Sequence, residues 1–224
     1  MSTSRESFLN TVRQAVRQGN RAGLPAAPPE RGRVGYQGAG ADLAAHFCEE
    51  LHKAGGHSHP VVGRQEILPT LRKLLQGKKP CRVLVGRDPL LDELDLRNNL
   101  SLSGVELFFP ESLGEPARDT CFAADVGITG ADYLIAETGS VVLGSRPDVP
   151  RSFSLLPPVH IVVAERGQVL PDLFDLFSAL ERQEGGLPAG LTVITGPSKT
   201  GDIELRLVTG VHGPGEVHVV LAGA

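Results

Sequence analysis

Short apolar runs recur along this chain, and each has too few residues for a helix. The run at residues 133–136, Tyr-Leu-Ile-Ala, is preceded by Gly and Asp and followed by Glu-Thr-Gly-Ser. An uninterrupted apolar run of this length is typical of a strand buried on both faces. We therefore predict that residues 133–136 form a central strand of an α/β sheet.

The other runs alternate with amphipathic segments. Helices are predicted at residues 41–55, 65–76 and 171–182, where apolar residues follow a helical spacing. Strands that alternate with helices favour a parallel or mostly parallel sheet flanked by helices. The expected fold class is thus α/β, with further strands at residues 60–62, 82–86, 105–109, 159–164, 191–195 and 216–221.

The N-terminal part differs from the rest in composition. Residues 3–18 predict an amphipathic helix, and residues 19–40 are rich in Gly, Pro, Ala and Arg, which is typical of a linker. We expect an N-terminal helical arm at 1–40 and an α/β domain at 41–224. A short isolated helix is marginally stable, so it must dock on its own domain or on another subunit, and docking on another subunit would form a homo-oligomer.

Composition argues against several classes of protein. A net charge of −4 gives no basic footprint for nucleic acid. The three cysteines, Cys48, Cys81 and Cys121, form no CxxC pair, so the sequence indicates no disulfide framework, iron–sulfur cluster or zinc site. No pair of histidines has the spacing of metal ligands, so a metal site is not expected. No run approaches the roughly 18 apolar residues of a membrane span, and no signal peptide is evident, so a cytoplasmic location is expected.

Polar residues follow the run at 133–136. Ligands bind beyond the carboxyl ends of strands in open parallel sheets, so Glu137, Thr138, Gly139 and Ser140 are predicted to lie at the mouth of a site. The alternative is a tight β-turn in which Gly139 supplies a positive φ and Glu137 is solvated.

A second polar cluster follows the predicted strand at 191–195. Backbone amides, two hydroxyls and an ammonium group suit a carboxylate or phosphate. We expect this cluster to share one rim of the sheet with residues 137–140 and to face the same pocket. The alternative is a Pro-Ser turn that caps a helix beginning near Asp202. The anion-binding candidates are Gly196, Ser198, Lys199, Thr200 and Asp202.

Two residues are candidates for catalysis. His212 could act as a general base, or it could be a turn residue bonded to the backbone. Glu137 could be a nucleophile for acyl transfer, since family I coenzyme A transferases carry a similar short Glu-x-Gly element. Alternatively, Glu137 hydrogen-bonds the amides of its own turn or a ligand hydroxyl.

Four blocks of sequence, at residues 127–140, 154–161, 195–204 and 210–221, together resemble the LUD domain family (DUF162), and its lactate-utilisation protein C branch in particular. The resemblance implies a fold of the NagB/RpiA/coenzyme A transferase-like type. It also implies a role in bacterial oxidation of L-lactate to pyruvate beside two iron–sulfur proteins. The clusters would belong to those partners, with no cofactor in this chain. No catalytic residue is carried over from the family.

Three functions remain open from the sequence. The chain could be a subunit of a lactate-oxidising system, in which Lys199 and the amides after Gly196 hold a carboxylate while Glu137 or His212 accepts the hydroxyl proton. It could instead be an acyl or coenzyme A transferase that uses Glu137. The third possibility is a binding or assembly module without catalysis. No role is assigned to the loop at residues 146–151.

Overall fold

The computed structural model describes residues 4–19, 40–76, 81–100, 104–114, 117–183, 187–201 and 207–223. Its contacts divide the chain into two compact units, Met1–Gln37 and Gly38–Ala224.

The described residues of the first unit form helix α1 (Arg5–Gly19). The hydroxyl of Ser4 accepts a hydrogen bond from the amide of Ser7, 3.2 Å away, which caps the helix. The predicted helix at 3–18 is therefore confirmed. Its apolar residues Phe8, Val12 and Val16 are exposed.

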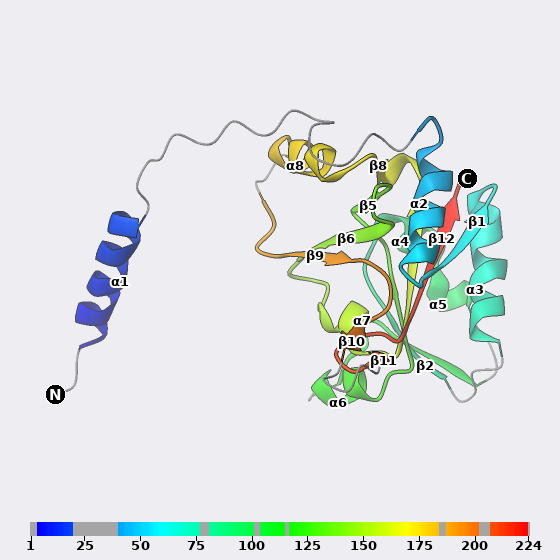
Figure 1. Cartoon of the computed structure of the whole chain (residues 1–224). Coiled ribbons are helices and arrows are strands. Elements are labelled where there is room, and N and C mark those ends of the chain that lie inside the picture. The colour runs from blue at the N-terminus through cyan, green and yellow to red at the C-terminus, as the bar shows by residue number, and fades with distance from the viewer. Residues whose placement is uncertain are drawn as a thin grey trace. The chain divides into compact units, whose positions relative to one another are not determined.

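A six-stranded sheet forms the centre of the second unit, and every neighbouring pair of its strands is parallel (Figure 1). This confirms the α/β fold with a mostly parallel central sheet. In spatial order the strands are β1 (His57–Val61), β12 (Glu216–Ala222), β7 (Val159–Glu165), β4 (Val126–Thr129), β2 (Cys81–Val85) and β3 (Val105–Phe108).

Helices cover this sheet and close its core. Leu71 and Leu75 of α3 are fully buried and pack in one cluster with strand residues such as Val83 and Val126. None of the helices in the described ranges has the length and apolar content that a bilayer span requires. The helices are α2 (Leu43–Lys53), α3 (Ile67–Leu75), α4 (Pro89–Glu93), α5 (Leu96–Asn99), α6 (Ala117–Phe122), α7 (Ser152–Leu155) and α8 (Leu173–Glu181), with short 3-10 turns at Arg64–Glu66, Pro110–Ser112 and Arg166–Gln168.

A second, four-stranded sheet corrects the prediction for residues 133–136. Leu134 and Ile135 are buried as expected, but their strand lies in the interior of this smaller sheet. The central sheet instead contains β4, whose four residues are all buried. The chain leaves that sheet at Gly130. The strands of the smaller sheet are, in spatial order, β8 (Val169–Leu170), β5 (Tyr133–Ile135), β6 (Ser140–Gly144) and β9 (Leu191–Ile194).

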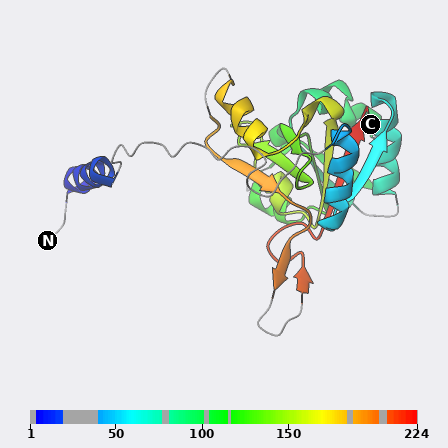
Figure 2. The same ribbon diagram turned by 45° about the horizontal axis from the view of Figure 1, so that its top comes forward.

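A two-stranded antiparallel ribbon, β10 (Lys199–Gly201) and β11 (Leu207–Thr209), extends away from the sheets (Figure 2). The predicted alternative, a helix that begins near Asp202, falls on residues 202–206, which are not among those described. The described residues on both sides of this stretch are strands.

The order of the central strands creates a switch point. After β2 the chain adds β3 on one side, and then it crosses to add β4 on the other side of β2. Connections therefore leave the carboxyl ends of β2 and β4 in opposite directions, which opens a crevice between them.

Candidate functional site

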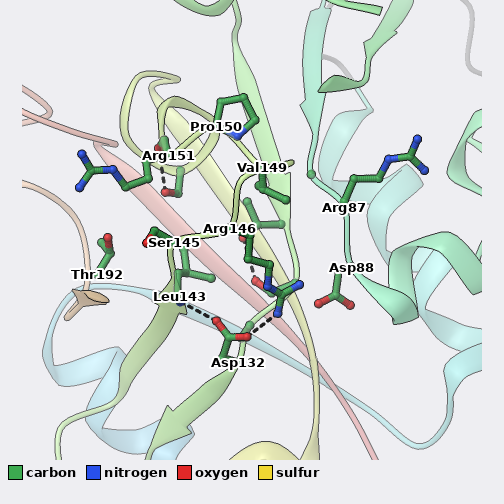
Figure 3. Close-up of a pocket in the computed structure, with 16 residues that line it drawn as sticks. Arg87, Asp88, Asp132, Leu143, Ser145, Arg146, Val149, Pro150, Arg151 and Thr192 are labelled. Atoms are coloured by element: carbon green, nitrogen blue, oxygen red, sulfur yellow. Dashed lines mark hydrogen bonds and ion pairs between the residues drawn. The ribbon is translucent and has the colours of Figure 1, made fainter. Parts of the chain in front are cut away.

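A cleft that is partly open to solvent lies at this switch point (Figure 3). The amide of Gly86, directly after β2, donates to the carbonyl of Ile128 in β4 at 2.8 Å, so the two strand ends lie side by side. The polar and charged residues that line the cleft are Arg87, Asp88, Thr129, Asp132, Ser145, Arg146, Arg151, Ser154 and Thr192.

The first carboxylate of the cleft follows β2. Asp88 is only 9% exposed, and its Oδ1 accepts a hydrogen bond from the amide of Leu90 at 2.9 Å, which caps α4. Gly130 faces it closely, because a Cβ added there would lie 2.1 Å from the Asp88 carboxyl carbon. Glycine at 130 thus lets the ends of β2 and β4 approach each other.

Burial raises the pKa of Asp88, and the charge of Asp132 adds to this effect. The amide of Leu90 and the charge of Arg146 act in the opposite direction without cancelling it. Asp88 is therefore a carboxyl group that takes up a proton more readily than an exposed aspartate does. Such a group suits hydrogen bonding to a ligand hydroxyl.

The second carboxylate follows β4. Asp132 accepts a hydrogen bond from the amide of Gly144 at 2.5 Å and forms an ion pair with Arg146. The Arg146 guanidinium lies between Asp132 and Asp88 in Figure 3. Burial alone would lower the pKa of Arg146, but its bond to Asp132 and the charges of Asp132 and Asp88 outweigh burial and raise it. The positive charge of Arg146 thus acts on the negative charges of both Asp132 and Asp88.

The other two arginines differ in their partners. Arg87 is paired with Glu111 at 3.1 Å and with Asp92 at 3.5 Å, and its side chain points away from Arg146 (Figure 3). The guanidinium of Arg151 has no hydrogen bond or ion pair with any residue that the structure describes. Its donors are thus available to a ligand.

A buried histidine supports the floor of the cleft. The Thr129 hydroxyl donates to the carbonyl of Gly130 at 2.9 Å, so it accepts from Nε2 of His160, also at 2.9 Å. His160 is fully buried, and burial lowers its pKa to about 4. The imidazole is therefore neutral near pH 7, and Nδ1 has no hydrogen-bond partner among the described residues.

These groups favour a small anion that also carries a hydroxyl. Of the three arginines in the cleft lining, Arg87 and Arg146 are paired with carboxylates, so the guanidinium of Arg151 is the group that can bind an anion. Guanidinium groups bind carboxylates and phosphates through paired hydrogen bonds. The hydroxyls of Thr129, Ser154 and Thr192 add neutral donors and acceptors.

The family model of the LUD domain matches residues 44–222 of this sequence. The chain belongs to the LUD domain family. Similar proteins include two named "Lactate utilization protein C". The one from Halalkalibacterium halodurans is 29% identical, over 96% of this chain and 95% of that protein. The one from Bacillus subtilis is 28% identical, over 97% and 95%.

Another relative, "Lactate utilization protein C 1" of Bacillus mycoides, is 32% identical over 75% of this chain and 72% of its own length. Among solved structures, a DUF162 family protein from Deinococcus radiodurans is similar, with a TM-score of 0.58 and 23% identity over 82% of this chain and 98% of that one. At this identity the likeness concerns the fold.

The LUD domain brings the two predicted polar segments together, but away from the cleft. Ser140 is hydrogen-bonded to Thr138 and, across to the other segment, to Thr195, with 2.7 Å between the oxygens in each case. Both segments pack against the C-terminal part of α2. A Cβ added at Gly139 would lie 2.1 Å from the amide nitrogen of Leu51, and one added at Gly196 would lie 2.7 Å from the carbonyl oxygen of Ala54. None of the predicted site residues that the structure describes lines the cleft.

The donors expected to hold an anion have partners within the domain. The Lys199 ammonium donates to the carbonyl of Ala54, and the Ser198 amide donates to the carbonyl of Pro214 at 2.8 Å. Thr200 pairs with Val208 in the ribbon, and Asp202 lies outside the described residues. Anion binding by this segment stays a prediction.

The two candidate catalytic residues lie apart from Asp88 and Asp132. The amide of Glu137 donates to the carbonyl of Pro171 at 3.0 Å, and burial together with the charge of Asp172 raises the pKa of its carboxyl group. His212 is exposed in the turn between β11 and β12. Their catalytic roles stay predictions.

Sequence reasoning missed the residues of the cleft, although a signal was present. Gly86-Arg87-Asp88 and Gly130-Ala131-Asp132 are two Gly-x-Asp triplets, each directly after a short apolar run. Val126–Thr129 has only four residues and contains a glycine, so its pattern does not predict a strand, and the second triplet cannot be placed at a strand end from the sequence. The loop at 146–151, to which no role was assigned, closes one side of the cleft.

Proposed function

We propose that this LUD domain is a component of a bacterial lactate-utilisation system and that its cleft binds a small carboxylate or phosphate anion. The observation that carries the first part is similarity over 95% of the length of two proteins named "Lactate utilization protein C". The charges of the cleft support the second part.

Lactate has the two groups that the cleft can recognise. Its carboxylate suits the guanidinium of Arg151, whose donors are unused in the described part of the chain. Its hydroxyl suits the side-chain hydroxyls of Ser154 and Thr192, which also line the cleft. Asp132 and Arg146 hold the cleft wall through their ion pair.

We assign the transfer of the electrons that lactate oxidation releases to partner proteins. Oxidation to pyruvate removes an electron pair and two protons, so an acceptor is needed. Iron–sulfur clusters are usually held by sets of four cysteines, whereas this chain has three that are far apart in sequence. We place the clusters on two iron–sulfur partner proteins, as the family resemblance implies.

A genetic experiment tests the role in lactate utilisation. Deletion of the gene in its own organism should abolish growth on L-lactate and leave growth on pyruvate intact. A plasmid copy of the wild-type gene should restore growth. Normal growth of the deletion strain on lactate would disprove the proposed role, provided that no second copy of the gene is present.

Calorimetry tests the anion site separately. Purified full-length chain is titrated with L-lactate, pyruvate and inorganic phosphate, and saturable binding of at least one of them is expected. If none binds, the anion proposal fails while the role in lactate utilisation still stands on the genetic result.

A further inference from the structure

The hydroxyl groups of the cleft differ in what they can offer a ligand. A hydroxyl has one proton to donate and two lone pairs that accept hydrogen bonds. Where a carbonyl group of the protein takes that proton, only lone pairs remain for a ligand. The partners of Ser154, Thr129 and Ser145, which all line the cleft, therefore show which of these hydroxyls accept and which donate.

Ser154 offers lone pairs alone. Its hydroxyl donates to the carbonyl of Arg151, three positions earlier in the chain, at 3.1 Å. Ser154 is only 5% exposed, so water hardly reaches it. Turning its proton towards a ligand would break the bond to Arg151 where water could not replace it. A ligand therefore meets Ser154 as a hydrogen-bond acceptor.

Thr129 is an acceptor too, whichever nitrogen of His160 carries the proton. The Thr129 hydroxyl oxygen lies 2.9 Å from the carbonyl oxygen of Gly130 and 2.9 Å from Nε2 of His160. With Nε2 protonated, the hydroxyl donates to Gly130, and with Nδ1 protonated it can also donate to Nε2. Because Thr129 is only 6% exposed, its proton stays inside the protein in both cases.

The groups near Gly190 have the opposite character. The Ser145 hydroxyl accepts a hydrogen bond from the Gly190 amide at 2.8 Å, and no acceptor in the described ranges takes its proton. A Cβ added at Gly190 would lie 3.6 Å from the Ser145 oxygen and 3.8 Å from a guanidinium nitrogen of Arg151. Thr192 lies on the same side of the cleft (Figure 3). Donors thus converge at a place that suits a carboxylate.

We propose that the cleft selects 2-hydroxy acids over the corresponding 2-oxo acids, and that Ser154 and Thr129 determine this selectivity. The inference rests on the anion site of the proposed function. A 2-hydroxy acid brings a proton, which Ser154 or Thr129 accepts while Arg151 binds the carboxylate. A 2-oxo acid brings only lone pairs to the same position, so the facing oxygens have no proton between them. Sites that bind a substrate hydroxyl reject an analogue without one, because buried polar groups are left unpaired.

Calorimetry with a matched pair of ligands tests this selectivity. The full-length wild type should bind L-lactate at least roughly 10-fold more tightly than pyruvate. Ser154→Ala should lower this ratio of affinities by roughly 5-fold, because one acceptor is lost. The amide of Ser154 also donates to the carbonyl of Arg151, at 3.3 Å, so α7 should keep its shape. Ser152→Ala is the control and should keep the wild-type ratio, since Ser152 lies on the same helix, contacts Cys121 and does not line the cleft.

Thr129 provides a second pair of variants. Thr129→Ser keeps the hydroxyl and should keep the ratio, whereas Thr129→Val has nearly the same shape without the hydroxyl and should lower the ratio by roughly 5-fold. Damage to the fold would weaken both acids alike and leave the ratio unchanged.

Two results would overturn the selectivity and leave the anion site in place. One is pyruvate binding to the wild type as tightly as lactate. The other is a ratio in Ser154→Ala and Thr129→Val equal to that of the wild type. If neither acid binds, the selectivity also fails, and phosphate binding then decides whether the anion site stands.

Discussion

Arg151 is the residue on which the anion proposal makes its sharpest prediction. Arg146 is bound to Asp132 and Arg87 to Glu111, whereas the Arg151 guanidinium has no partner in the described ranges. Removing it should therefore affect a ligand more than it affects the fold. We expect Arg151→Ala to weaken binding of the anion found by calorimetry by roughly 10- to 100-fold, the usual range for a lost charge-assisted hydrogen bond.

Arg118→Ala supplies the control for that measurement. Arg118 is an exposed arginine on α6 that stacks over Phe122 and does not line the cleft. Its removal changes the net charge by the same amount. Equal affinities for the two variants would mean that Arg151 does not contact the anion.

His160 makes stability depend on pH. An unfolded histidine takes up a proton near pH 6.5, whereas burial holds the pKa of His160 at about 4 in the folded chain. Between these values the unfolded state binds more protons, so the free energy of unfolding falls as pH is lowered from 6.5 towards 4. This histidine alone should contribute on the order of 3 kcal/mol to the loss.

Urea unfolding across this pH range checks the prediction. His160→Gln keeps a donor for Thr129 but cannot titrate, so its stability should fall less steeply with acid. His59, whose pKa is also lowered to about 4 by burial and by His218 and His57, should add a separate share that His59→Gln removes. An unchanged slope for His160→Gln would show that another group causes the acid sensitivity.

Individual residues of the cleft were hard to predict because their neighbours are distant in sequence. Asp88 and Asp132 are 44 positions apart, and only the pairing of β2 with β4 brings them to one crevice. In contrast, the positive φ of 62° at Gly139 depends on local geometry, and the β-turn alternative predicts it. Features that depend on neighbouring residues in the sequence could therefore be predicted, whereas the set of residues that line the cleft could not.

At the scale of elements, the turn between β5 and β6 joins the smaller sheet to α2. Gly139 has a positive φ, and a Cβ there would lie 2.1 Å from the backbone amide of Leu51. Neither backbone can yield easily, so Gly139→Ala should cost on the order of 3 kcal/mol of unfolding free energy.

Gly167→Ala is the matched control for this turn, since a Cβ at Gly167 meets nothing within 4 Å. Chemical denaturation of both variants gives the comparison. Should Gly139→Ala be as stable as Gly167→Ala, the turn would not be packed against α2 as described.

Elements with a clear apolar period were predicted, and those without one were not. The strand predicted at 159–164 and the helix predicted at 65–76 have strong local patterns. The strand occurs as β7, and the helix occurs as a 3-10 turn followed by α3, over residues 64–75. Strand β4 contains a glycine and only four residues, so it was missed. The split into two sheets was also missed, because β6 pairs with β9 some fifty residues later and no local pattern encodes such a pairing.

At the scale of the whole molecule, the cleft belongs to one part of the chain. All the residues that line it lie between Gly86 and Thr192. A chain reduced to residues 41–224, the predicted domain, should therefore fold and bind the anion with the dissociation constant of the full chain. A tenfold weaker affinity, measured by calorimetry on correctly folded material, would mean that the arm takes part in binding.

Most of the cleft wall comes from three stretches, at 86–88, 129–132 and 143–151, and Ser154 and Thr192 complete it. The parallel pairing of β2 with β4 and the smaller sheet hold these residues in place. A partly unfolded chain cannot assemble them, so an occupant would bind the native state alone. Occupancy should then retard protease digestion and raise the melting temperature in proportion to the logarithm of its concentration. Thermal-shift screening of small acids thus offers a direct route to the physiological occupant, with intact tertiary structure as its reporter.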